Sequence, residues 1–85
     1  MKICFTKTFM RDYRKLPLEL QEAVDKQLAL LLDHSRRPSL NLKKMNDPRD
    51  IWEGRVTYSH RFTFQMEGDT CILRRVGTHD TLKNP

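Results

Sequence analysis

The sequence of 85 residues contains few cysteines and few glycines, and it has no long apolar run. Its two cysteines, Cys4 and Cys71, show no CxxC spacing and no adjacent histidine, so we expect them to be reduced, buried and inert. The three glycines form no phosphate-binding loop, and the chain has neither a serine nucleophile elbow nor paired carboxylates. Three histidines without a repeated ligand spacing predict no zinc site, and we expect no cofactor.

No apolar run approaches the roughly 18 residues that a membrane-spanning helix requires, and the start MKICFTKTF lacks the apolar centre of a signal peptide. We therefore expect no membrane association and a cytoplasmic location. A chain of this length buries only about 60–65% of its unfolded surface. It cannot support two separate cores, so we expect residues 1–85 to form one domain.

The charge is unbalanced, with 16 Lys and Arg against 11 Asp and Glu and a net charge of +5. This balance favours an anionic partner such as RNA, DNA or an acidic protein segment, and charge alone does not choose among them.

Hydrophobic spacing divides the chain into two halves. Residues 2–5 are predicted to form a strand, and Thr6 or Thr8 is a candidate N-cap for the helix that follows. Pro17 ends that helix and opens a second one over residues 17–35. Apolar residues recur at helical spacing in both helices: Phe9, Tyr13, Leu16, Leu20, Val24, Leu28 and Leu31.

The second half begins with a proline- and asparagine-rich connection over residues 36–50. Beyond it the apolar spacing changes to two, which predicts strands over 51–58, 60–66 and 70–76, with turns at Ser59–His60 and Gly68–Asp69. The expected order is β-α-α-β-β-β, an α+β fold in which a helical hairpin packs on one face of a small, mainly antiparallel sheet. The opposite face is left to solvent or ligand.

Strand alternation sends Trp52, Gly54, Val56, Tyr58, Phe62 and Phe64 to the core. It sends a polar set to the other face: Glu53, Arg55, Thr57, Arg61, Thr63 and Gln65. Two arginines on adjacent strands make a positive site of phosphate size, and a solvated face with cross-strand ion pairs is the alternative. We expect Arg75 to share this face and Arg74 to lie near an edge, because Ile72 and Val76 then point to the core.

His79 lies just beyond the last strand, where it can donate or accept a proton near neutral pH, as cleavage of an RNA phosphodiester requires. A structural histidine beside Asp80 is the alternative. His34 and His60 are weaker candidates. The connection carries a basic run, which suits a nucleic-acid backbone or is simply a solvated surface: Arg36, Arg37, Lys43, Lys44 and Arg49.

Five segments together resemble the toxins of the RelE/ParE superfamily over about residues 3–82: FTKTFMRDYRKLP, LQEAVDKQLALLL, LNLKKM, IWEGRVTYSHRFTFQ and LRRVGTHD. The resemblance implies a toxin that a partner antitoxin neutralises, and RelE-like members cleave mRNA in the ribosomal A site without a metal. Arg61 matches the arginine of the family's third strand, and His79 matches the catalytic histidine of YafQ-like members. Glu53 and Arg55 stand where RelE has two lysines, and Leu82 stands near the position of a C-terminal aromatic residue.

The first hypothesis is therefore an endoribonuclease in which His79 is the general acid, Arg61 and Arg55 stabilise the reacting phosphate and Glu53 is the base. Lys43, Lys44 and Arg75 would hold RNA or the ribosome. The alternatives are a ParE-like inhibitor of DNA gyrase without chemistry, and an inactive interaction module. In each case we expect an acidic antitoxin segment that folds on binding to the basic face.

Overall fold

The computed structural model describes residues 2–33 and 41–85. Its elements follow in the order β1 (Lys2–Phe5), α1 (Lys7–Arg14), α2 (Leu18–Leu32), β2 (Lys43–Lys44), β3 (Trp52–Arg55), β4 (Arg61–Glu67), β5 (Thr70–Gly77) and α3 (His79–Leu82). The predicted α+β class and the order of the main elements are confirmed. The two short elements, β2 and α3, were not predicted.

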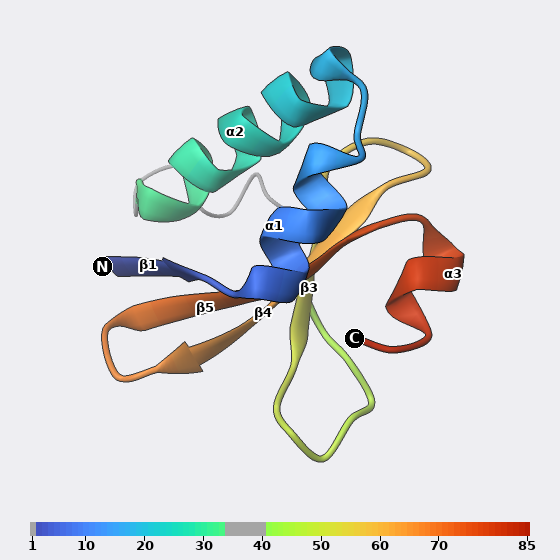
Figure 1. Cartoon of the computed structure of the whole chain (residues 1–85). Helices are drawn as coiled ribbons and strands as arrows, with labels where there is room; N and C mark the ends of the chain where they lie inside the picture. The colour runs from blue at the N-terminus through green and yellow to red at the C-terminus, as the bar shows by residue number, and fades with distance from the viewer. Residues whose placement is uncertain (1, 34–40) are drawn as a thin grey trace.

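The strands form one sheet in the order β1-β5-β4-β3-β2, in which β1 runs parallel to β5 and every other pair is antiparallel. Strands β3, β4 and β5 form the predicted meander. Helices α1 and α2 lie together on one side of the sheet, and α3 follows the far end of β5 (Figure 1). No helix in the described part of the chain is both long enough and apolar enough to span a membrane.

The hydrophobic core lies between the helices and the sheet. Phe9 of α1 and Val24, Leu28 and Leu31 of α2 pack in one cluster with residues of β4 and β5: Phe62, Phe64, Cys71, Leu73 and Val76. The rings of Phe62 and Phe64 stack with centroids 5.7 Å apart. The helical spacing therefore located most of the core, although Leu20 is only half-buried.

Thr6 is the residue that starts α1. Its hydroxyl accepts a hydrogen bond from the backbone N–H of Phe9 at 3.1 Å, as an N-cap does. The same hydroxyl donates to the carbonyl of Leu73 at 2.8 Å. Thr6 therefore both begins the helix and attaches it to β5.

Three expectations along the chain were wrong. Strand β3 ends at Arg55, so that Tyr58 lies in a loop, where its side chain is 92% exposed rather than turned to the core. Cys4 is exposed, whereas Cys71 is buried as expected, and the two form no disulfide. The connection contains a strand, β2, that pairs with β3. His34, Arg36 and Arg37 lie outside the described residues.

A β-bulge changes the positions of the two arginines on β5. Thr63 pairs with Arg75, but the next residue, Phe64, pairs with Leu73, so Arg74 is the extra residue. Arg74 donates to the side chain of Gln65 at 2.8 Å, which places it on the polar face beside Arg75. The expectation that only Arg75 shares that face was wrong.

The polar face is also partly covered. Thr63 and Ile51 are fully buried, and Leu82 of α3 is 7% exposed, although none of the three belongs to the core cluster under the helices. Gly77 permits this covering, since a Cβ there would lie 2.5 Å from the hydroxyl of Thr81. The absence of a side chain at Gly77 thus lets α3 fold back closely against the end of β5.

Candidate functional site

A cleft of about 420 Å³ opens between the loop that follows β3 and the start of α3. It is lined by Glu53, Tyr58, Ser59, Arg61, Thr78, His79 and Leu82. Of the four residues predicted to carry chemistry, Glu53, Arg61 and His79 line this one cleft. Arg55 does not line it.

The sheet register explains how these side chains come together. Arg61 lies between Arg55 of β3 and Gly77 of β5 in one cross-strand row, and Glu53 lies beside Thr63 in the next row. His79 follows Gly77 by two residues, so the first turn of α3 brings it to the end of the Arg61 row. Neighbouring side chains on one face of a sheet are within reach of each other.

Arg61 also organises the loop that forms one wall of the cleft. Its Nη1 donates to the carbonyl of Thr57, and to those of Tyr58 and His60 at 3.0 Å each. Within residues 2–33 and 41–85, its Nε and Nη2 have no acceptor. The guanidinium therefore keeps donors for a ligand oxygen while its other end holds the loop.

The three residues predicted to hold RNA have different surroundings. Lys43 is exposed and lies across from Glu53, on the polar face. Lys44 has its ammonium 3.0 Å from the carboxylate of Asp50.

Arg75 donates from Nε to Asp12 of α1 at 2.7 Å, and this bond to a carboxylate raises the pKa of Arg75 above its ordinary value. Arg75 thus attaches β5 to α1, and its charge is largely compensated.

Sequence reasoning missed Tyr58 as a site residue, because its alternation with Val56 suggested a longer strand and an inward side chain. Only the early end of β3 frees Tyr58 to line the cleft. Across the part of the chain that the structure describes, no group of three or more His, Cys, Asp or Glu side chains is arranged to hold a metal ion.

No protein-family model matches the chain. A curated relative, toxin RelE3 of Methanocaldococcus jannaschii, is 28% identical, and the match covers 89% of this chain and 88% of that protein. Among solved structures, the RelB–RelE antitoxin–toxin complex of Methanococcus jannaschii contains a chain with a TM-score of 0.77 and 22% identity, covering 95% of each chain. YafQ of E. coli has a TM-score of 0.79 and 12% identity, covering 95% of this chain and 96% of that one.

Proposed function

We propose that this chain, which is similar to toxin RelE3, is a toxin of the RelE/ParE superfamily and an endoribonuclease that cleaves mRNA at the ribosomal A site and so inhibits translation. The observation that carries this proposal is the cleft shared by Glu53, Arg61 and His79. A base, a fixed cation and a group that transfers protons near neutral pH are the parts that phosphodiester cleavage requires.

The proposed reaction uses the RNA's own 2′ hydroxyl as the nucleophile. Glu53 accepts the 2′ proton, the 2′ oxygen forms a bond to phosphorus, and the bond from phosphorus to the 5′ oxygen breaks. His79 donates a proton to the departing 5′ oxygen. Arg61, with Arg55 beside it in the register, stabilises the extra negative charge on the phosphate in the transition state. The products are a 2′,3′-cyclic phosphate and a free 5′ hydroxyl.

RelE-like enzymes place an aromatic residue near their C-terminus, where this chain has Leu82. In this chain Tyr58, from the loop after β3, supplies an aromatic surface instead. Its ring is 92% exposed and borders the cleft, so a base of the substrate can stack on it. Stacking of one base on an aromatic side chain contributes about 1–3 kcal/mol.

We therefore expect Tyr58→Ala to weaken RNA binding by about 5- to 150-fold, which corresponds to that stacking energy. Titration with a labelled RNA measures it. Tyr58→Phe should bind like the wild type because it keeps the ring, and the two variants should have equal thermal stability because the side chain is exposed. If Tyr58→Phe binds as weakly as Tyr58→Ala, the hydroxyl is what matters and the stacking role is wrong.

The function itself is tested by inducing the chain in cells and following mRNA integrity and DNA supercoiling together. We expect translation arrest within minutes and mRNA fragments that end in 2′,3′-cyclic phosphate at A-site codons. Altered supercoiling with intact mRNA would instead indicate a gyrase inhibitor, which the RelE and YafQ relationships do not favour. No effect on growth would indicate an inactive interaction module.

We propose that the partner of this chain is a cognate antitoxin, because the similar RelE chain of Methanococcus jannaschii is in a complex with the antitoxin RelB. We expect its binding segment to be acidic and to fold on the toxin, because the toxin has a net charge of +5 and a basic sheet face.

The affinity for this antitoxin should fall at least about tenfold when salt is raised from roughly 0.1 M to 0.5 M, since salt screens charge pairs. Calorimetry with the antitoxin that restores growth to toxin-expressing cells provides the measurement. An affinity that does not change with salt would contradict the charge-based interface and would point to an apolar surface on α1 and α2.

A further inference from the structure

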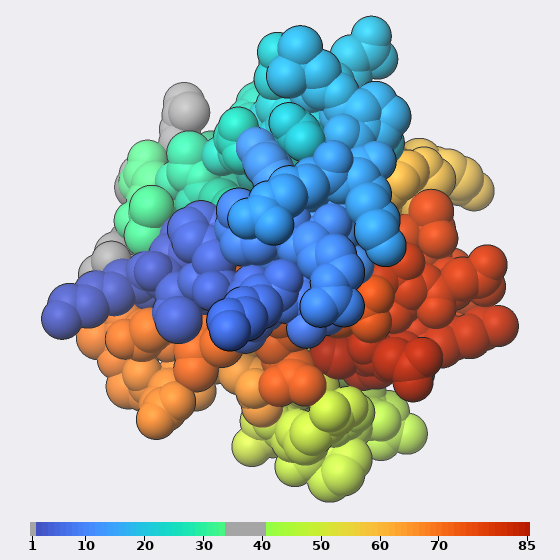
Figure 2. Space-filling model, in the orientation of Figure 1, coloured from blue at the N-terminus to red at the C-terminus, as the bar shows by residue number. Residues whose placement is uncertain are grey.

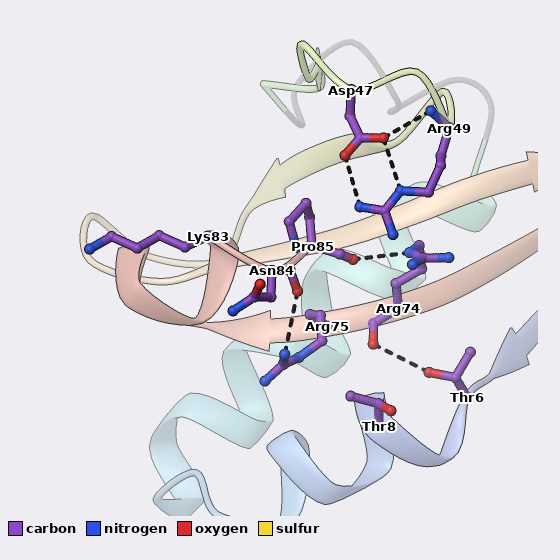
Figure 3. Close-up of a pocket in the computed structure, with 9 residues that line it drawn as sticks. All are labelled: Thr6, Thr8, Asp47, Arg49, Arg74, Arg75, Lys83, Asn84 and Pro85. Carbon is purple, nitrogen blue, oxygen red and sulfur yellow. Dashed lines mark hydrogen bonds and ion pairs between the residues drawn. The ribbon is translucent and has the colours of Figure 1, made fainter.

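A second cleft, of about 510 Å³, is lined by none of the residues of the candidate active site and takes no part in the proposed chemistry (Figure 3). Its lining includes four basic side chains, one acidic side chain and two hydroxyls. The basic side chains are those of Arg49, Arg74, Arg75 and Lys83, and the hydroxyls are those of Thr6 and Thr8. Such a concentration of donors suits a ligand that carries several negatively charged oxygens.

Four segments of the chain build this cleft, and Thr6 and Thr8 at the start of α1 form one of them. Arg49 comes from the loop before β3, Arg74 and Arg75 come from the bulge in β5, and Asn84 and Pro85 follow α3. Figure 2 shows the loop before β3 as a yellow-green lobe below the blue N-terminal segments and beside the red C-terminal segment. The side chains from these segments meet in Figure 3. The cleft therefore exists only in the folded chain.

The arginines of this cleft already hold oxygen atoms. Arg74 Nε donates to the carbonyl of Pro85 at 3.0 Å, and Arg75 Nη1 donates to the carbonyl of Asn84 at 3.3 Å. A phosphate oxygen is charged and forms a strong bond to a guanidinium. A phosphate that enters the cleft can therefore take the place of the Pro85 oxygen at Arg74.

Arg49 is held differently, by a carboxylate. Its Nε and Nη2 donate to Asp47 at 3.0 and 2.8 Å, and these bonds lower the pKa of Asp47 to about 2. Asp47 is thus ionised at neutral pH and keeps the Arg49 guanidinium in place. Arg74, by contrast, has no carboxylate side chain bonded to it within the described residues, and its donors hold the oxygens of Gln65 and Pro85.

The sheet register relates the two clefts. Arg61 pairs with Gly77, and Arg75 pairs with Thr63, two residues further along both strands. Two residues of a strand extend about 6.6 Å. An RNA that binds with its scissile phosphate at Arg61 and runs along β5 therefore brings a neighbouring phosphate to the second cleft.

We propose that the second cleft binds a phosphate of the RNA strand next to the scissile phosphate, through Arg49 and Arg74, and that the carbonyls of Asn84 and Pro85 occupy it until RNA binds. This inference rests on the proposed endoribonuclease function and adds a substrate-positioning site to it.

The test uses the full-length protein and a short, fluorescently labelled RNA whose 2′ hydroxyls are all methylated, so that it cannot be cleaved. Fluorescence anisotropy gives its Kd over a series of salt concentrations. We expect Arg49→Gln and Arg74→Gln each to reduce the slope of log Kd against log salt by about 0.7, as the loss of one phosphate contact on a single strand does. The affinity should fall by a similar factor for every RNA sequence. In cleavage of mRNA on programmed ribosomes, KM should rise while kcat changes little.

Lys26→Gln is the matched control, because it removes one positive charge from an exposed position on α2, a helix that lines neither cleft. If the two arginine variants bind RNA as this control does while His79→Ala still abolishes cleavage, the second cleft is not an RNA site and the proposed function stands. If the wild type cleaves no mRNA on programmed ribosomes, the function and this inference both fail. If the arginine variants lose affinity only for an acidic antitoxin peptide, the cleft binds carboxylates and the RNA proposal is wrong.

Discussion

The His79→Ala variant should cleave mRNA on programmed ribosomes about 10²–10⁴ times more slowly than the wild type in single-turnover experiments. Its affinity for the ribosome should hardly change, since the proton transfer occurs only in the transition state. His79 lies at the start of α3 and is exposed, so its replacement leaves the core intact. Circular dichroism and thermal melting verify the fold of the variant.

Replacing the leaving 5′ oxygen by sulfur separates a general acid from a merely structural histidine. A thiolate departs without being protonated, so the modified RNA should be cleaved at nearly equal rates by His79→Ala and the wild type. His60→Ala is the matched control, because His60 lies near the cleft but its side chain does not line it. If the folded His79→Ala protein keeps full activity on ordinary RNA, the chemistry must rest with Glu53 and the arginines.

Arg61→Ala should show a different pattern. It removes a charge opposite the phosphate, and it also removes the donor that binds the carbonyls of the Val56–His60 loop. We therefore expect both a lower rate of cleavage and a weaker affinity for RNA. The contrast with His79→Ala distinguishes a residue that binds in the ground state from one that acts only in the transition state.

The Asp12→Ala variant should lose about 3 kcal/mol of unfolding free energy. The carboxylate of Asp12 accepts from Arg75 at 2.7 and 3.1 Å and from the backbone N–H of Val76 at 3.2 Å. Asp12 is only 9% exposed, so its removal leaves a half-buried guanidinium and a buried backbone donor without their acceptor. The contact also helps to attach α1 to β5, as does the backbone hydrogen bond from Thr6 to Leu73.

Urea denaturation measures the loss, and Asp12→Asn should fall between the wild type and Asp12→Ala because an amide oxygen can still accept from Val76. Asp25→Ala is a suitable control: it removes a carboxylate from an exposed position on α2, where its partner is the Tyr13 hydroxyl at 2.8 Å. We expect that control to lose less than about 1 kcal/mol. A loss of similar size in both alanine variants would show that the Arg75–Asp12 pair contributes no more than a surface contact.

Much of the fold could be predicted because the signals are local. The strand at residues 2–5, the N-cap at Thr6 and the turn at Gly68 and Asp69 all occur where the sequence indicates them. Gly68 has a φ of 59°, a conformation that glycine adopts without strain. Each of these signals depends on a few neighbouring residues, and the rest of the chain does not alter them.

The face of the sheet was harder to predict, because one inserted residue changes the direction of the side chains that follow it. The bulge opposite Thr63 and Phe64 puts Arg74 on the polar face, and alternation alone had placed it near an edge. Likewise, no periodicity shows that β3 ends at Arg55 and leaves Tyr58 exposed.

The sequence by itself determined the α+β class, the core and the resemblance to RelE/ParE toxins, since these depend on spacing and on the order of segments. The tertiary structure alone decided which charged groups meet. Arg75 donates to Asp12 across 63 positions of the chain, and Arg74 donates to the Pro85 oxygen across 11. Such contacts depend on how α1 and the segment after α3 pack against β5, because packing brings together groups between which the sequence shows no relation.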